Sequence, residues 1–218
     1  MEDFRQSTVR PRILLADDHA MVTESLRSLL AEKGHDVVGV VSDGRALIAA
    51  ALELKPDVVV LDMGMPLMNG FDAALRLKQL LPKVKIVFLT MKDDPNLAAA
   101  VLSLGPLGYV LKHSAASELL TAIAEVLRGK PYVTPRLNPE NWAVREARAH
   151  QFAKDLTPRQ REVLQLLAEG RPMKEVGGIL NVSEKTVMFH KYHIMRSFNL
   201  KSNTDLVFLA LKENLISA

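Results

Sequence analysis

The chain has 218 residues, no cysteine and a formal net charge of +3. At roughly 100 to 200 residues per domain, this length suits two small domains. The absence of cysteine excludes disulfide frameworks, thiolate metal sites and cysteine nucleophiles. Residues 152–218 carry ten Lys and Arg against seven Asp and Glu, whereas residues 1–130 carry 15 against 16. A basic excess confined to the C-terminal part fits a polyanionic partner there, and it equally fits an ordinary solvated surface.

The N-terminal residues Met-Glu-Asp-Phe-Arg lack the apolar segment of a secretory signal. No later stretch approaches the roughly 18 consecutive apolar residues that a membrane-spanning helix needs. We therefore expect a cytoplasmic protein that has no membrane partner.

Five short apolar runs alternate with segments of helical periodicity across residues 12–128. The runs are RILLA from Arg12, VVGVV from Val37, DVVVL from Asp57, KIVFLT from Lys85 and YVLK from Tyr109. Near-continuous Val, Ile and Leu is typical of strands buried on both faces, as in a parallel sheet covered by helices. The pattern predicts a doubly wound α/β domain over residues 12–128 with a five-stranded parallel sheet, preceded by a tail at residues 1–11.

The alternation of apolar runs and helical segments ends at residues 129–155, which contain three prolines and a charged stretch. We interpret these residues as a linker. Strand signals vanish over residues 156–218, where four short helical segments follow one another. They are separated by Gly170, by Asn181 and by residues 199–201. This part of the chain is predicted to be a small all-α domain.

Polar side chains stand at the ends of four of the predicted strands. Asp17 and Asp18 follow the first strand, Asp62 ends the third, Thr90 ends the fourth and Lys112 follows the fifth. In an open parallel sheet, ligands bind beyond the carboxyl ends of the strands. Three carboxylates at one edge repel each other unless a cation joins them, and oxygen ligands of this kind suit Mg²⁺. One carboxylate could then attack a phosphoryl donor and form an aspartyl phosphate.

Each of these residues has an ordinary explanation when it is taken singly. Asp17 or Asp18 would be a helix N-cap, Thr90 a strand-end residue and Lys112 a solvent-facing lysine. Asp62 alone would be a loop residue. Their shared placement at equivalent strand ends is what favours a common site.

Residues 12–128 resemble the receiver domain of response regulators. The matching motifs are ILLADDH at 13–19, DMGMPLMNG at 62–70, FLT at 88–90 and GYVLK at 108–112. The resemblance implies a flavodoxin-like strand order and phosphorylation of Asp62 by a sensor histidine kinase. It also implies a Mg²⁺ site formed by Asp17, Asp18, Asp62 and the Gly64 carbonyl. Thr90 and Lys112 would coordinate the phosphoryl group, and Tyr109 would be the switch residue.

An enzymatic alternative is a phosphohydrolase of the haloacid-dehalogenase type, which also forms an aspartyl phosphate. Those enzymes place a second Asp two residues after the nucleophile, whereas this chain has Gly64 there. We therefore expect no enzymatic activity. None of the six histidines pairs convincingly with a metal-binding neighbour, and His19 is interpreted as a packing or surface residue.

Residues 156–198 carry the signals of three consecutive helices. Thr157 and Pro158 suit an N-cap and a first helical position, and the segment ends at Gly170. A short helix, a turn at Asn181 and a longer helix capped by Ser183 then form a helix-turn-helix pattern. With LTPRQREVLQLLAEG and NVSEKTV, this region resembles LuxR-type DNA-binding domains, and the whole chain resembles the NarL/FixJ family.

The longer of these two helices is expected to meet double-stranded DNA. Val187, Ile194 and Phe198 share one face and should pack inward, which leaves the other faces for the major groove. The predicted DNA-binding residues are Lys185, Thr186, Met188, Phe189, Lys191, Tyr192 and Lys201. Because Met188 and Phe189 are apolar, a protein-binding regulator without specific DNA binding stays open as an alternative.

A last helix is predicted at about residues 203–213. Its apolar stripe is too broad for one core contact, which favours a second buried face. We expect a homodimer contact there on activation, through Leu206, Val207, Ala210 and Leu211. The alternative is that the helix packs deeply into the core of its own domain. Taken together, the sequence predicts a phosphorylation-controlled transcription regulator that binds promoter DNA as a dimer.

Overall fold

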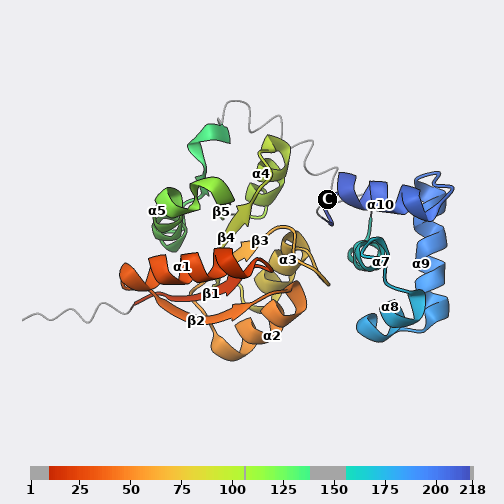
Figure 1. Ribbon diagram of the computed structural model, residues 1–218, viewed down its shortest axis with the longest axis horizontal. Helices are drawn as coiled ribbons and strands as arrows, with labels where there is room; N and C mark the ends of the chain where they lie inside the picture. The colour runs from red at the N-terminus through yellow and green to blue at the C-terminus, as the bar shows by residue number, and fades with distance from the viewer. Residues whose placement is uncertain (1–9, 106, 138–155, 217–218) are drawn as a thin grey trace, which may run out of the picture.

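The structure is a computed structural model that describes residues 10–105, 107–137 and 156–216 (Figure 1). An N-terminal domain contains a sheet with helices on both faces, and a C-terminal domain consists of helices alone. Parts of the predicted tail and of the predicted linker, residues 1–9 and 138–155, lie outside the described residues.

The N-terminal sheet is parallel throughout, with the order β2-β1-β3-β4-β5-β6. Its strands are β1 (Arg12–Ala16), β2 (Asp36–Val41), β3 (Val58–Asp62), β4 (Lys85–Thr90), β5 (Gly108–Leu111) and β6 (Tyr132–Val133). Every residue of β3 and β5 is buried, as continuous apolar runs require when helices cover both faces of a sheet. The doubly wound sheet and the flavodoxin-like order of its first five strands are confirmed.

The sixth strand corrects the expectation of a five-stranded sheet. β6 pairs with β5 through Gly108 and Tyr109, and Leu137 is buried in the core of the N-terminal domain. The ordered domain therefore continues beyond residue 128 into the segment that we interpreted as linker. A strand of two residues between prolines is too short to give a periodic signal.

Two layers of helices enclose the sheet. The helices are α1 (Ala20–Glu32), α2 (Gly44–Leu54), α3 (Gly70–Leu80), α4 (Pro95–Leu102) and α5 (Ala115–Leu127), with short 3₁₀ turns at Lys112–Ser114 and Pro135–Leu137. Leu26 of α1 and Leu119 of α5 belong to one apolar core, whereas Leu47 of α2 and Leu77 of α3 belong to the other. This arrangement leaves the carboxyl edge of the strands open to side chains from the loops.

The C-terminal domain consists of α7 (Pro158–Ala168), α8 (Met173–Leu180), α9 (Glu184–Ser197) and α10 (Asn203–Lys212). Thr157 caps α7 in a reciprocal capping box with Gln160, and the Ser183 hydroxyl accepts from the Thr186 N–H at the start of α9. Asn181 makes the turn between α8 and α9 in the left-handed conformation, at φ 54°. The helix-turn-helix arrangement follows from these end signals. No helix among the described residues is long and apolar enough to cross a membrane.

Candidate functional site

Four of the predicted site residues meet at the carboxyl edge of the sheet. Asp17 directly follows β1, Asp62 and Thr90 end β3 and β4, and Lys112 directly follows β5. Asp17, Asp62 and Thr90 are 5%, 6% and 1% exposed, so the site is sheltered from bulk water. Burial of two carboxylates side by side requires a nearby cation.

Lys112 supplies that cation in the structure. Its Nζ lies 2.8 Å from Oδ2 of Asp17 and 3.0 Å from Oδ2 of Asp62. Burial raises the pKa of Asp62 above its ordinary value, while the Lys112 ammonium lowers it and the Asp17 carboxylate raises it further. The backbone of Gly64 also hydrogen-bonds to Asp62, which lowers that pKa. The site thus holds a carboxylate whose charge is only partly compensated.

His19 is a surface residue, as expected, with a side chain that is 63% exposed, but it lies beside the aspartates, whereas we expected no histidine to pair with a metal-binding neighbour. Its Nδ1 lies 3.0 Å from Oδ1 of Asp17 and 2.9 Å from Oδ1 of Asp18. Ligand atoms of His19, Asp17, Asp18 and Asp62 all lie within 4.8 Å of one another. The sequence signal that could have found it is its position immediately after the two aspartates.

The donor set fits a hard divalent cation. Carboxylate oxygens from Asp17, Asp18 and Asp62 converge, and oxygen ligands are those that Mg²⁺ prefers. Oδ2 of Asp17 is buried and lies 2.8 Å from Nζ of Lys112, and a carboxylate oxygen has a further lone pair for a ligand. The geometry can therefore accommodate a cation together with an acceptor carboxylate.

Thr90 and Tyr109 lie on neighbouring strands beside this pocket. Oγ1 of Thr90 accepts a hydrogen bond from the backbone N–H of Lys92, at 3.0 Å. Tyr109 is fully buried, and the register of β4 and β5 pairs it with Phe88. The predicted switch residue is thus enclosed in the core of the domain in this structure.

The predicted DNA-facing side of α9 is open to solvent. Met188, Phe189 and Tyr192 are 38%, 64% and 65% exposed, whereas Val187 and Ile194 of the same helix are fully buried. Lys185 and Lys201 are exposed, and Thr186 and Lys191 are half-buried. The helix thus presents an apolar and basic face in the positions that the sequence predicts.

Three further residues of α9 lie near Phe189, of which His193 and Arg196 are exposed and His190 is half-buried. Arg196 is exposed, one helical heptad after Phe189. The rings of His190 and His193 lie 5.7 and 6.3 Å from the ring of Phe189, measured between centroids. Helical periodicity counted from Phe189 could have found His193 and Arg196, which lie four and seven residues later, but not His190, which is the next residue.

The predicted dimer contact on α10 needs correction. Leu206 and Ala210 are 2% and 0% exposed and belong to the core of their own domain, so they cannot form the contact in this conformation. Val207 and Leu211 are half-buried, and Phe208, which was not among the predicted contacts, is 66% exposed. The broad apolar stripe is therefore divided between the domain core and an outer face centred on Phe208.

Comparison with known proteins covers both domains. Residues 13–124 match the response regulator receiver domain, and residues 154–210 match the luxR family of bacterial regulatory proteins. The oxygen regulatory protein NreC of Staphylococcus epidermidis is 36% identical over 215 residues, covering 94% of this chain and 99% of NreC.

Two solved structures of RcsB extend the likeness to three dimensions. RcsB of Salmonella enterica serovar Typhimurium, bound to promoter rprA in the presence of the phosphomimetic BeF3⁻, is 29% identical, with a TM-score of 0.60 over 96% of this chain and 100% of that chain. A structure of two RcsB dimers bound to two parallel DNAs is 30% identical, with a TM-score of 0.56 over 94% of this chain and 98% of that chain.

Proposed function

The chain belongs to the response regulators of the NarL/FixJ type, which are phosphorylation-controlled DNA-binding regulators of transcription. We propose that Asp62 is the residue that accepts the phosphoryl group. The observation that carries the proposal is the contact of Lys112 Nζ with both Asp17 and Asp62 at the carboxyl edge of the sheet. Asp62 is the last residue of β3, and its carboxylate contacts the Lys112 ammonium and hydrogen-bonds to the backbone of Gly64.

The donor in this proposal is a phosphohistidine of a sensor histidine kinase. A carboxylate oxygen of Asp62 attacks phosphorus, and the bond from phosphorus to the histidine nitrogen breaks. Lys112 neutralises one phosphoryl oxygen, and the Thr90 hydroxyl hydrogen-bonds another. Asp17, Asp18, Asp62 and the Gly64 carbonyl would hold Mg²⁺, which when bound offsets the negative charge of the transferring group.

The target of the C-terminal domain in this proposal is double-stranded DNA, which places its action in the cytoplasm. α9 lies in the major groove, with Phe189, Met188 and Tyr192 against the bases and with Lys185, Lys191 and Lys201 toward phosphates. The exposed aromatic side chains support this assignment, because a solvated surface does not favour them. In the two related structures RcsB is bound to DNA.

The active species in this proposal is a homodimer that pairs through α10. Val207, Phe208 and Leu211 form the contact, and a twofold pair of α9 helices then meets two half-sites about one DNA turn apart. The exposure of Phe208 supports the pairing.

One experiment tests the acceptor and the target together. Acetyl phosphate with Mg²⁺ should add one phosphoryl group, measured by intact mass, and should strengthen binding to DNA selected from a random pool. Asp62→Asn should abolish both effects, whereas Asp36→Asn, an exposed residue at the start of β2, should behave as the wild type. Full phosphorylation of Asp62→Asn would overturn the assignment of the acceptor. A phosphorylated protein that selects no DNA would instead favour a protein-binding regulator.

A further inference from the structure

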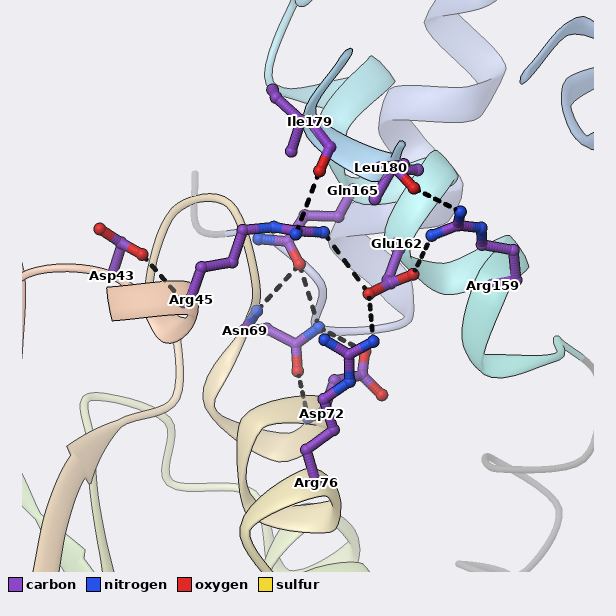
Figure 2. Close-up of polar contacts among 10 residues, drawn as sticks. All are labelled: Asp43, Arg45, Asn69, Asp72, Arg76, Arg159, Glu162, Gln165, Ile179 and Leu180. Carbon is purple, nitrogen blue, oxygen red and sulfur yellow. Dashed lines mark hydrogen bonds and ion pairs between the residues drawn. The ribbon is translucent and has the colours of Figure 1, made fainter. Parts of the chain in front are cut away.

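Helix α7 carries buried polar residues on two sides. On one side, Arg161 pairs with Asp72 of α3 in the N-terminal domain. Beside this pair, Glu162 lies 3.4 Å from Arg76 of α3, measured between nitrogen and oxygen (Figure 2). On another side, Gln160 faces α9 of its own domain and is 8% exposed. A buried amide needs hydrogen-bond partners for both its oxygen and its nitrogen, and Gln160 finds them at the start of α7 and on α9.

The start of α7 fixes the orientation of the Gln160 amide. Its Oε1 accepts from the backbone N–H of Thr157 at 2.8 Å, which is one half of the capping box. Because a backbone N–H can only donate, the atom that faces it must be the amide oxygen. The same turn is held by Arg159, which donates to Glu162 at 2.8 Å and to the carbonyl of Leu180 at 2.7 Å (Figure 2). The amide nitrogen of Gln160 therefore has a defined direction.

This amide nitrogen sets the tautomer of a histidine on α9. Nε2 of Gln160 lies 2.9 Å from Nδ1 of His193. Since the amide nitrogen can only donate, Nδ1 must accept, and this requires the neutral imidazole with its proton on Nε2. The hydroxyl of Ser197, 3.5 Å from the same Nδ1, can donate to it as well. Gln160 thus determines which ring nitrogen of His193 carries the proton.

His193 lies on the side of α9 that is assigned to the major groove. It follows Phe189 by four residues, so the two share a face of the helix. The centroids of their rings are 6.3 Å apart, and both residues are exposed. The Nε2–H of His193 is therefore a hydrogen-bond donor without a formal charge, next to the aromatic ring that is expected to meet the bases.

We propose that His193 donates a hydrogen bond from Nε2 to an acceptor of the DNA, and that Gln160 is the positioning residue that sets the required tautomer. The proposal rests on α9 lying in the major groove. The acceptors there are guanine O6, the N7 atoms of purines, thymine O4 and the phosphate oxygens of the backbone. With its proton on Nε2, the imidazole cannot accept from the amino groups of cytosine or adenine. The contact therefore distinguishes acceptor positions from donor positions.

The first test determines the tautomer in the full-length chain. In protein labelled with nitrogen-15 histidine, correlations between ring protons and ring nitrogens distinguish a protonated Nε2 from a protonated Nδ1, and His193→Ala identifies the signal. At about pH 8, where an unperturbed imidazole is neutral, His193 should carry its proton on Nε2. Gln160→Glu keeps the acceptor for the Thr157 N–H but replaces the donor with a carboxylate oxygen, so the proton should move to Nδ1. A proton on Nδ1 in the wild type, or on Nε2 in Gln160→Glu, would overturn the proposal.

The second test measures binding to DNA that the wild-type chain selects from a random pool, with all chains treated with acetyl phosphate and Mg²⁺. His193→Ala should weaken binding about threefold to tenfold, as expected for one lost hydrogen bond. Gln160→Glu should weaken it by a similar factor, but should lose most of this effect when His193 is already alanine. Equal effects of Gln160→Glu in the two backgrounds would assign them to the added charge alone and overturn the positioning role. His113→Ala, at an exposed histidine of the N-terminal domain, should match the wild type.

The third test identifies the acceptor on the DNA. Each base pair of the selected site is replaced in turn, and each phosphate is replaced by a neutral methylphosphonate. A replacement that weakens the wild type but not His193→Ala marks the position that His193 contacts. A marked base pair assigns the contact to a base, and a marked phosphate assigns it to the backbone. If no replacement behaves in this way, His193 does not contact the DNA and the proposal is wrong.

The outcomes separate this inference from the proposed function. A phosphorylated chain that selects no DNA would refute the proposed target of the C-terminal domain. A chain that selects DNA and binds it equally well after His193→Ala would refute only the contact of His193.

Discussion

The hydroxyl of Tyr109 donates a hydrogen bond to the backbone carbonyl of Lys92, 2.9 Å away. Burial raises the pKa of Tyr109 above its ordinary value, so this hydroxyl stays protonated and remains a donor. The N–H of the same residue, Lys92, donates to Thr90. The backbone of Lys92 is therefore held at both its N–H and its carbonyl, and this fixes the loop that follows Thr90.

We predict that the phosphorylated state is long-lived in the absence of a phosphatase. Gly64, two residues beyond Asp62, has no side chain to orient a hydrolytic water, and Lys92 cannot accept a proton while it is charged. General-base assistance typically contributes about 10² to 10⁴ in rate, so its absence should extend the lifetime to many minutes or longer. Phosphate release measured over time tests this. Turnover within seconds would contradict it, and Gly64→Glu should shorten the lifetime.

On the DNA-binding face, Phe189→Ala and Lys191→Ala should have separable effects. Phe189 is expected to contact thymine methyl groups, so its loss should cost roughly 1 to 3 kcal/mol on the selected site and little on random DNA. Lys191 is expected to contact a phosphate, so its loss should weaken binding to all sequences. It should also reduce, by about one unit, the slope of the logarithm of the binding constant against the logarithm of the salt concentration. Titrations at several salt concentrations measure both. An unchanged ratio of specific to random binding in Phe189→Ala would show that another face of α9 reads the bases.

For the dimer contact, Phe208→Glu should abolish cooperative binding to DNA that carries two half-sites. A charge at an apolar contact opposes pairing of two α10 helices, whereas the domain core, which contains Leu206 and Ala210, is unaffected. Binding to a single half-site should remain. Leu80→Glu, at a half-exposed position on α3, serves as a control for an added surface charge. Retained cooperativity in Phe208→Glu would remove α10 from the dimer contact.

In helix α8, Gly177→Ala and Gly178→Ala should change stability in opposite directions. A Cβ at Gly177 would lie 2.8 Å from the carbonyl oxygen of Val182, and this overpacking should cost about 1 to 3 kcal/mol. A Cβ at Gly178 would meet nothing within 4 Å, so alanine there should add about 0.4 to 1 kcal/mol to the free energy of unfolding. Urea denaturation followed by far-ultraviolet circular dichroism measures both. Equal effects of the two substitutions would contradict the close approach at Gly177.

The fold and the pocket were accessible from the sequence because both depend on regular features. Continuous apolar runs predict buried parallel strands, and parallel strands bring their carboxyl ends to one edge. Residues 45 to 50 positions apart, such as Asp17, Asp62 and Lys112, therefore meet without any local signal between them. The caps at Thr157 and Ser183 were accessible for the same reason, because each is defined by its immediate neighbours.

What the sequence did not reveal depends on contacts between elements. Leu206 and Val207 are both apolar, and only the packing of α10 against α7 decides which one is buried. Arg161, Glu162 and Gln165 are polar residues of a helix whose outer face would ordinarily be solvated, yet all three are buried. Their burial results from the second domain, and an amphipathic pattern within one helix cannot report it.

The pairing of Arg161 with Asp72 joins two domains of a single chain. Among single chains, the ratio between those whose two domains are in contact and those whose domains are apart therefore does not depend on the protein concentration. Association of two chains through α10 would instead increase with concentration. Where pairing requires the domains to be apart, overproduction draws chains away from the form with the domains in contact by mass action.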